Sequence, residues 1–309
     1  VLITNTRIDM SELNELTPAQ QLGKKYGGSQ GRQMALKFEF ETLLWLPKFK
    51  FTNNQVIAKL FDISPGTARD KLRRLATRGV IRKVPCLSVR DNYVYLLTQL
   101  GVTQLKELWG VTAKSPWLDV TKIRDRTRAS HDLCVQWFCA EQRRQGNTKR
   151  ITSEFEQGES LELAINLNGN KKHVRHRPDA IIQHWSADDE KESQFYGSWA
   201  VEYESVRKGA DRMEEIFSYH YKHCNDDRSK YWGVHYLFSR RADLEFYQKI
   251  LNKVAKRKFP VRYTHQEGGE EYDENQKSRE SFLGCFKFHH VHQELVKAFY
   301  FERSQETDF

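Results

Sequence analysis

Carboxylates placed inside short apolar segments restrict the fold of this chain more than any other sequence feature. Asp179 lies in the segment 177–182, and Glu202 and Glu204 lie in the segment 198–204. Both segments are short apolar runs bounded by polar residues, which is typical of buried or half-buried strands. Acidic side chains seldom enter a sheet interior unless something pairs with them. The sequence therefore predicts a sheet with a charged site built into it.

The spacing of these acids predicts that they meet. Side chains alternate along a strand, so Glu202 and Glu204 project from one face and Tyr203 from the other. If Asp179 lies on a neighbouring strand, three oxygen donors converge and repel one another without a cation. Oxygen donors suit Mg²⁺ or Mn²⁺, so we expect one of these ions at Asp179, Glu202 and Glu204. For each acid taken alone, the alternative is a surface or ion-paired residue.

Two further side chains are candidates for the same site. Glu154, on a strand predicted over residues 150–156, reaches the same edge if the strands are adjacent. Lys208 or Arg207, just beyond the Glu202 strand, is placed to stabilise a phosphate that carries developing charge. The candidate catalytic residues are Asp179, Glu202, Glu204, Glu154 and Lys208.

The charge balance favours a polyanionic partner. The 309 residues include 50 Lys and Arg against 41 Asp and Glu, a formal charge of +9. A basic chain around an acidic cluster suggests that the basic residues bind nucleic acid and that a metal at the acidic cluster cuts or holds it. The alternative is a soluble basic protein without such a partner. No apolar run approaches the roughly 20 residues that span a bilayer, and no signal peptide is visible. Five scattered cysteines without a C-x-x-C pair argue against a disulfide framework and a zinc site, so we expect a cytoplasmic protein with no membrane partner.

Residues 35–110 have the pattern of a winged helix-turn-helix. A first apolar helix is expected to stop at Pro47, and a second short helix follows Thr52. Ser64 and Pro65 supply an N-cap and a first-position proline for a third helix. Two alternating strands over 80–84 and 93–97 then form the wing.

The third helix and the wing carry the candidate DNA contacts. Apolar residues of the helix recur on one side, which leaves its basic residues on the other. Exposed basic residues on the would-be groove face favour nucleic acid. The alternative is a winged helix used for protein contacts alone. The candidates are Arg69, Arg73, Arg74, Arg82 and Lys83.

The remaining sequence divides into an arm, a linker and a second domain. Residues 1–34 read as a flexible basic N-terminal arm and residues 111–129 as a basic linker. Residues 130–309 interleave strands and helices, which predicts an α/β domain with a mixed central sheet, and α+β for the whole chain. The expected order is a helix from 130, the strand 150–156, a polar hairpin region, the two acidic strands, a helix over 209–223, a strand over 232–238, a helix over 242–254, a polar excursion over 266–280 and a helix over 290–301.

These motifs resemble those of the PD-(D/E)xK nuclease superfamily. Pro178 and Asp179 correspond to its "PD", and Glu202 and Glu204 stand at the ends of its "ExK". Glu204 occupies the lysine position, so the resemblance implies metal catalysis without the usual lysine to activate water. Lys208, on the following helix, is the candidate to compensate for this lysine.

A second set of motifs covers nearly the whole chain. It consists of the winged-helix pattern, His131-Asp132-Leu133 opening a helix, Ser153-Glu154 on a strand, Pro178-Asp179-Ala180, and Val201-Glu202-Tyr203-Glu204 with a trailing Arg207. Together these motifs resemble those of the replication-relaxation family, which includes the MobC-type conjugative relaxases. The resemblance implies a restriction-endonuclease-like domain that nicks one DNA strand at the transfer origin of a plasmid or integrative element.

A different relaxase chemistry has partial sequence support. His290-Val291-His292 fits the letters of a HUH metal site, and Tyr300 follows it. The flanking residues read as an amphipathic helix, in which positions two apart point in different directions, so we do not assign this site. His173 and His176 lie in a polar basic stretch and are expected to touch phosphate or solvent.

The sequence thus predicts a metal-dependent, site- and strand-specific DNA nickase. Its expected partners are origin DNA and accessory mobilisation or coupling proteins. One alternative is a non-enzymatic DNA-binding replication or transcription regulator with a degenerate nuclease fold, which the Glu204 substitution keeps open. The other is an endonuclease that cuts both strands.

Overall fold

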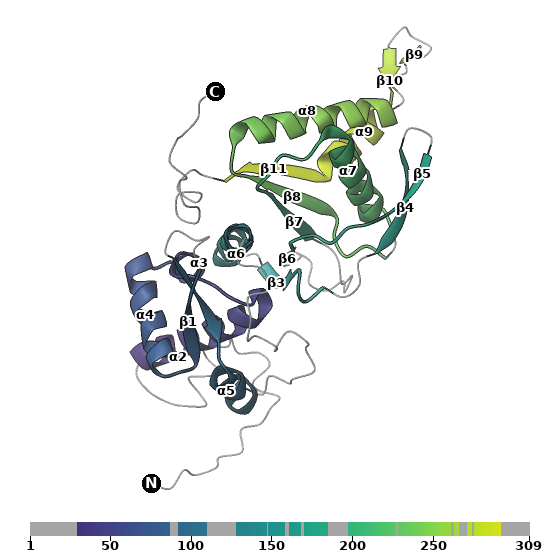
Figure 1. Cartoon of the computed structure of the whole chain (residues 1–309). Helices are drawn as coiled ribbons and strands as arrows, with labels where there is room; N and C mark the ends of the chain where they lie inside the picture. Colours follow the sequence, from purple (N-terminus) through teal and green to yellow (C-terminus); the bar gives the residue numbers. More distant parts are fainter. Residues whose placement is uncertain are drawn as a thin grey trace, which may run out of the picture.

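The computed structural model shows a mixed α/β arrangement in which helices surround a five-stranded sheet (Figure 1). The predicted arm over residues 1–34 and linker over 111–129 lie mostly outside the described residues, although a helix already begins at Gln30. None of the helices in the described ranges is long and apolar enough to cross a bilayer. The structure describes residues 30–86, 92–109, 128–146, 148–157, 161–167, 170–184, 197–226, 228–260, 263–265, 271–273 and 275–291.

Three helices open the described chain: α2 (Gln30–Phe49), α3 (Asn54–Phe61) and α4 (Pro65–Thr77). The predicted cap of α4 is confirmed, because Ser64 Oγ accepts a hydrogen bond from the backbone N–H of Thr67 at 3.1 Å. The predicted stop of the first helix at Pro47 is wrong, since α2 continues through Pro47 to Phe49. A proline this close to the end removes a single helical hydrogen bond, and burial of Leu46 and Phe49 in the core offsets that loss.

An antiparallel hairpin and one more helix complete this part of the chain. Strand β1 (Ile81–Pro85) pairs with β2 (Tyr93–Leu97), and α5 (Gln99–Trp109) follows. Thr52 and Tyr95 exchange two backbone hydrogen bonds, which ties the segment before α3 to β2. The second strand is almost wholly buried, whereas Arg82 and Lys83 on β1 are exposed.

The central sheet has the order β11-β8-β7-β6-β3. Strand β6 runs antiparallel to both β3 and β7, whereas β7, β8 and β11 are mutually parallel, so the predicted mixed sheet is confirmed. Parallel neighbours need crossover connections, and helices provide them. The strands are β3 (Thr148–Ser153), β6 (Ala180–His184), β7 (Ser198–Glu204), β8 (Gly233–Phe238) and β11 (Phe286–His290); the crossover helices are α7 (Ala210–Cys224), α8 (Arg241–Lys258) and α9 (Gln276–Gly284).

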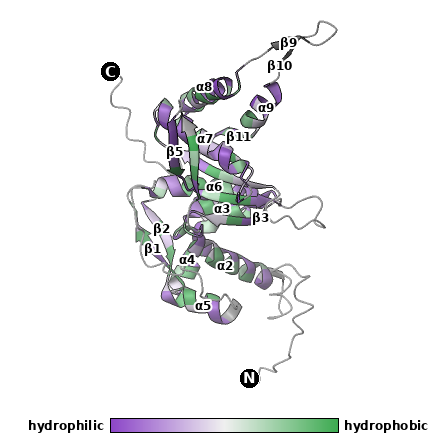
Figure 2. Cartoon of the chain, turned by 90° about the vertical axis from the view of Figure 1, so that its right-hand side faces the viewer, coloured by the Kyte–Doolittle hydropathy of each residue, from purple (hydrophilic) through white to green (hydrophobic). Residues whose placement is uncertain are grey.

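Each face of the sheet has its own apolar core. Helix α6 (Ala129–Arg144) packs against the face that carries Ile182, Val201 and Tyr203. Helices α7, α8 and α9 cover the opposite face, which carries Ile181 and Ala200. Hydrophobic residues are concentrated in the strands between these layers (Figure 2).

Two smaller hairpins lie outside the sheet. Strands β4 (Glu162–Leu167) and β5 (Asn170–Arg175) form the predicted polar hairpin, and β5 is mostly exposed and hydrophilic (Figure 2). The buried apolar side chains of this hairpin, Leu163, Ile165 and Val174, pack on Tyr219 of α7. A short pair, β9 (Tyr263–His265) and β10 (Glu271–Asp273), precedes α9.

The N-terminal helices share a core with the sheet through α6. Helix α3 packs along α6, and one apolar cluster runs from α2 to the strands β6 and β7. Trp45 Nε1 donates a buried hydrogen bond to Gln136 Oε1 at 3.2 Å. Lys48 Nζ donates to the backbone oxygen of Ile151 at 3.2 Å and pairs with Glu156 at 3.0 Å.

Three predicted elements in the second half are corrected. The strand expected over 150–156 ends at Ser153, because residues 154–156 form a turn. The excursion over 266–280 contains β10 and the start of α9. The helix expected from His290 is wrong at its beginning, because His290 ends strand β11; residues 292–301 lie outside the described part. The helix that spoke against the HUH motif is therefore absent at His290, although His290 does not line the pocket that contains Asp179 and Glu202.

Replacing Gly101 with alanine tests the contact of α5 with the hairpin. Alanine favours helices, but a Cβ at position 101 would lie 2.2 Å from the backbone oxygen of Val80. We expect Gly101→Ala to lower the free energy of unfolding by about 1–3 kcal/mol in urea titrations. The matched control is Gly284→Ala in α9, where a Cβ meets nothing within 4 Å and stability should be unchanged or slightly higher. Equal stability of the two variants would contradict the predicted clash.

Candidate functional site

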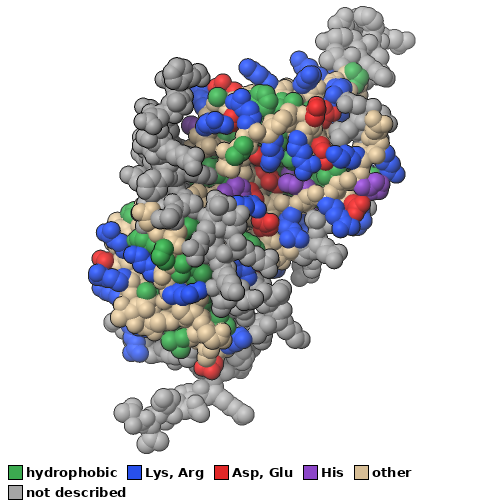
Figure 3. Space-filling model, in the orientation of Figure 1, with side chains coloured by type: hydrophobic (Ala, Val, Ile, Leu, Met, Phe, Trp, Pro, Cys, Tyr) green, Lys and Arg blue, Asp and Glu red, His purple; other side chains and the backbone are tan. Residues whose placement is uncertain are grey.

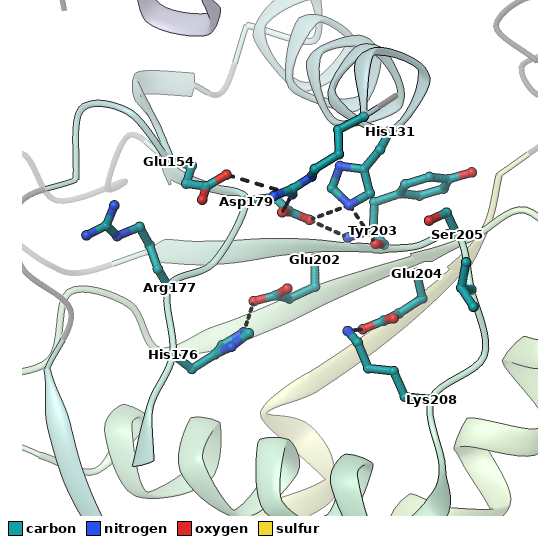
Figure 4. A pocket seen from close by; sticks show the side chains of 12 residues that line it. His131, Glu154, His176, Arg177, Asp179, Glu202, Tyr203, Glu204, Ser205 and Lys208 are labelled. Atoms are coloured by element: carbon teal, nitrogen blue, oxygen red, sulfur yellow. Dashed lines mark hydrogen bonds and ion pairs between the residues drawn. The ribbon is translucent and has the colours of Figure 1, made fainter. Parts of the chain in front are cut away.

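The predicted acidic residues line one pocket where the start of β6 meets the end of β7 (Figure 4). Asp179 immediately precedes β6, and antiparallel pairing sets Ala180 opposite Val201 of β7. The pocket has a volume of about 350 Å³. Its lining includes all five predicted catalytic residues: Asp179, Glu202, Glu204, Glu154 and Lys208.

The predicted alternation along β7 is confirmed. Glu202 and Glu204 point to the side of the sheet covered by α7, and Tyr203 points toward α6 (Figure 4). Both glutamates are buried at 4 % exposure. Buried carboxylates are costly without partners, so the counter-charge of each one decides what the site can be.

Asp179 is held from the α6 side of the sheet. Its Oδ2 accepts a hydrogen bond from the backbone N–H of Tyr203 at 2.9 Å and lies 3.4 Å from Nε2 of His131. Its Oδ1 lies 3.7 Å from the guanidinium of Arg128. Glu154, in the turn after β3, contacts the same guanidinium at 3.9 Å. Arg128 therefore bridges two of the predicted acids.

The His131 imidazole is an imidazolium at neutral pH. Burial acts to lower its pKa, but the charge of Asp179 and the contact with Asp132 raise it to about 9. Both ring nitrogens face acceptors, since Nδ1 lies 3.2 Å from Asp132 Oδ1 and Nε2 lies 3.0 Å from the backbone oxygen of Tyr203. Two donors are available only in the protonated ring.

The pKa values of Asp179 and Glu202 are shifted in opposite directions. Burial acts to raise the pKa of Asp179, His131 opposes this rise and the negative charge of Glu202 adds to it, which leaves the pKa at about 7. Burial also acts to raise the pKa of Glu202, but its contacts with His176 hold it well below the usual range. Glu202 Oε1 lies 2.6 Å from His176 Nε2 and 3.5 Å from His220 Nε2. The contact with His176 thus keeps Glu202 ionised.

Glu204 pairs with Lys208. Burial raises the pKa of Glu204, and the Lys208 ammonium, which contacts Glu204 Oε1, opposes that rise. The backbone N–H of Lys208 donates to the Tyr247 hydroxyl at 2.6 Å. Arg207, the other predicted phosphate-stabilising residue, instead pairs with the buried Asp243 at 2.6 Å. Lys208 is therefore the cation that this segment supplies to the pocket.

Each acid also has a counter-charge from a side chain. His131, His176 and Lys208 each pair with one of the acids. In donor chemistry the carboxylates still fit a divalent ion. Within the described ranges, however, the donor atoms that all lie within 4.8 Å of one another belong to His176, Glu202 and His220, and the three carboxylates form no group this tight.

Basic side chains surround the acids. Arg128, Arg177 and Lys208 line the pocket together with the carboxylates. On this face of the molecule, Asp, Glu and His side chains near the middle are surrounded by Lys and Arg side chains (Figure 3). A polyanion that approaches this face meets positive charge before it meets the acids.

The predicted DNA-contacting residues lie elsewhere, on α4 and β1. Thr67, Arg69, Asp70, Arg73 and Arg74 are exposed, whereas Ala68, Leu72 and Leu75 are buried, as predicted. Arg73 pairs with Asp70 at 3.4 Å in an exposed contact. Lys83 Nζ lies 3.6 Å from the ring centroid of Tyr93. Arg82 and Lys83 are exposed on the first strand of the hairpin.

Sequence reasoning missed three residues of the pocket. Arg128 fell in the predicted linker, and His176 was expected at phosphate or solvent, whereas it contacts Glu202. His173 of β5, by contrast, is exposed and lies 3.4 Å from Glu162. For His131 the sequence did contain a signal, because His131 belongs to the His-Asp-Leu motif at the start of α6. His220 had none, because it lies in the middle of a helix.

The residues that line the pocket lie in a region that matches a known protein family. Residues 43–214, more than half of the chain, match the replication-relaxation family. The chain belongs to the replication-relaxation family. The matched range covers α3 through β7 and the beginning of α7, and therefore includes His131, His176, Asp179, Glu202 and Glu204, whereas His220 lies beyond it. No curated protein and no solved structure shows significant similarity to this replication-relaxation protein.

The charge state of His131 tests the pocket of this replication-relaxation protein. We expect its imidazole to titrate with a pKa near 9, and His220, which burial keeps neutral, with a pKa of about 4. Asp179→Asn removes the main charge that raises the pKa of His131, which should then fall toward 6.5 or below. Histidine side-chain NMR across pH measures both values. An unchanged His131 titration in Asp179→Asn would show that another group sets its pKa.

Proposed function

We propose that this protein is a relaxase, a metal-dependent DNA endonuclease that nicks one strand at the transfer origin of a mobilisable plasmid or integrative element. The family description points to a role in DNA replication or mobilisation. The observation that carries the finer proposal is the gathering of Asp179, Glu202 and Glu204 in one pocket with basic residues around it. The mixed sheet and the "PD" and "ExE" positions support a PD-(D/E)xK-like nuclease domain.

Asp179, Glu202 and Glu204 are the residues that would hold Mg²⁺ or Mn²⁺. When bound, the ion lowers the pKa of an attacking water and neutralises charge on the phosphate. Asp179 is positioned for this role by its hydrogen bond from Tyr203 N–H, and Glu202 is ionised at neutral pH through its histidine contacts. Each of these two carboxylates is therefore held in place by a hydrogen bond.

The cations of the pocket bind and orient the DNA backbone. The Arg128 side chain is 49 % exposed and the Lys208 side chain is 38 % exposed, so each can contact a phosphate while it stays near its acid. Arg177 is also exposed at the same rim. Lys208 takes the place of the lysine that the superfamily motif has two residues after its glutamate. It reaches the pocket from beyond the end of β7 and contacts Glu204 there.

The N-terminal part is proposed to select the origin. Helices α3 and α4 with the β1–β2 hairpin have the order of a winged helix-turn-helix, in which the second helix of the pair enters the major groove. The exposed arginines of α4 would read bases, and Arg82 and Lys83 on β1 would contact the backbone. Accessory mobilisation or coupling proteins are further proposed partners.

The regulator alternative also has a specific observation in its favour. The three acids are already paired with His131, His176 and Lys208, as a DNA-binding protein without catalysis would require. The nicking experiment separates the two functions, because a regulator binds origin DNA and leaves it intact. An endonuclease that cuts both strands would yield linear DNA in the same assay.

Nicking of supercoiled origin plasmid tests the proposed reaction. With Mg²⁺ or Mn²⁺, we expect open circles from the native protein, and a loss of about 100-fold or more in rate for Asp179→Asn and Glu202→Gln, since each removes a metal ligand. Band shifts should show unchanged binding, because neither residue lies on α4 or the hairpin. Asp211→Asn, an exposed acid in the first turn of α7, is the control and should nick normally. Normal nicking by both test variants would remove these carboxylates from the reaction.

Band shifts with origin and unrelated DNA test the proposed reading helix. Substituting a base-reading arginine, Arg69→Ala, Arg73→Ala or Arg74→Ala, should cost about 1–3 kcal/mol of discrimination. Lys83→Ala should weaken binding to all sequences alike and reduce its salt dependence. Lys253→Ala, exposed on α8, is the matched control and should bind normally. Full origin affinity in all three arginine variants would exclude α4 as the reading element.

A further inference from the structure

Three side chains from three separate elements meet on the α7 side of the sheet. His176 follows β5, Glu202 lies in β7, and His220 lies in α7. Glu202 Oε1 is 2.6 Å from His176 Nε2 and 3.5 Å from His220 Nε2. One donor atom from each residue lies within 4.8 Å of the other two. Two imidazoles and a carboxylate are a common donor set for first-row transition ions.

His220 is unusual for a buried histidine. Its side chain is fully buried, and its Nδ1 lies 2.8 Å from the hydroxyl of Tyr231. Its Nε2 points toward Glu202, and within the described part of the chain it has no hydrogen-bond partner. Histidines that bind metals typically have one nitrogen held by a hydrogen bond while the other faces the ion. Tyr231 therefore orients His220 as a ligand would be oriented.

His176 is held through its backbone, and its ring lines the pocket. The Tyr219 hydroxyl lies 3.0 Å from the backbone oxygen of His176, and the His176 ring packs edge-on against His220 with centroids 5.0 Å apart. The His176 side chain is 16 % exposed and lines the pocket, whereas His220 is fully buried behind it. The remaining coordination positions of an ion would face the pocket.

We propose that His176, Glu202 and His220 form a binding site for a divalent first-row transition ion such as Zn²⁺. Ligand atoms about 2.1 Å from a tetrahedral ion are about 3.4 Å apart. The distance between Glu202 and His220 already has this value, and the hydrogen bond between Glu202 and His176 opens by several tenths of an ångström when the ion replaces its proton. Imidazole nitrogens disfavour Mg²⁺ and favour zinc-like ions.

This site goes beyond the proposed Mg²⁺ or Mn²⁺ site, with which it shares Glu202. The other two ligands, His176 and His220, do not belong to the predicted acidic set. The competing explanation is that a protonated His176 simply pairs with Glu202 beside a neutral, packed His220. These explanations differ in whether the protein without DNA binds a transition ion at these three residues.

Titration of the metal-stripped full chain with Co²⁺, followed by visible absorption and by competition with Zn²⁺, distinguishes them. We expect one Co²⁺ site with absorption of a nitrogen- and oxygen-ligated ion. His176→Ala and His220→Gln should weaken it by at least about 100-fold, because loss of an outer hydrogen-bond partner alone costs about 10–100-fold. Tyr231→Phe should show that smaller effect. His173→Ala, which changes an exposed histidine three residues before His176, should bind Co²⁺ normally.

Two results would overturn the proposal: no Co²⁺ site in the native chain, or undiminished binding in the His176 and His220 variants. Circular dichroism melting checks that each variant folds. If His220→Gln fails to fold, the Co²⁺ affinity of His176→Ala tests the site, because the His176 side chain is partly exposed and its loss should be tolerated. Co²⁺ binding is measured without DNA and does not depend on the nuclease reaction. A native chain that binds Co²⁺ but does not nick origin DNA would therefore contradict the proposed nuclease activity and support the metal site.

Discussion

The arrangement of this protein depends on the neutralisation of carboxylates buried at the end of β7. Glu202 and Glu204 are each 4 % exposed, and unpaired charges at such positions would cost several kcal/mol. The cations that pair with the acidic cluster come from three directions: His131 from α6, His176 from the segment after β5, and Lys208 from the segment before α7. Each of these elements must dock on the sheet to supply its charge, so the electrostatics of one strand restrict the placement of its neighbours.

Helix α6 links this site to the N-terminal part of the chain. Its first turn presents His131 to Asp179, and its middle packs against α3 and receives the hydrogen bond from Trp45 to Gln136. The apolar core is continuous across this helix. The proposed DNA-reading helix α4 and the proposed catalytic pocket are therefore connected through packed side chains.

Local signals in the sequence succeeded where a short-range interaction decides the structure. Ser64 caps α4 because its hydroxyl reaches an N–H three residues away, and Glu202 and Glu204 share a face because side chains alternate in any strand. They failed where distant packing decides. Pro47 does not end α2 because the following residues are buried by other elements, and His290 extends β11 because β8 offers a parallel partner. Helix α9 was not predicted, because the sequence around it is polar and its buried residue is Phe282 alone.

The sequence by itself determined the classes of element, the mixed sheet and the acidic character of the pocket, because alternation, capping and composition act over a few residues. Which group offsets each buried charge was decided only by the tertiary structure. Glu202 and His220 are separated by a strand end, a loop and half a helix, and nothing in the helical pattern of α7 marks His220 as different from His223. Their contact exists because α7 crosses the sheet above β7, and that crossing is a property of long-range packing that no local sequence pattern contains.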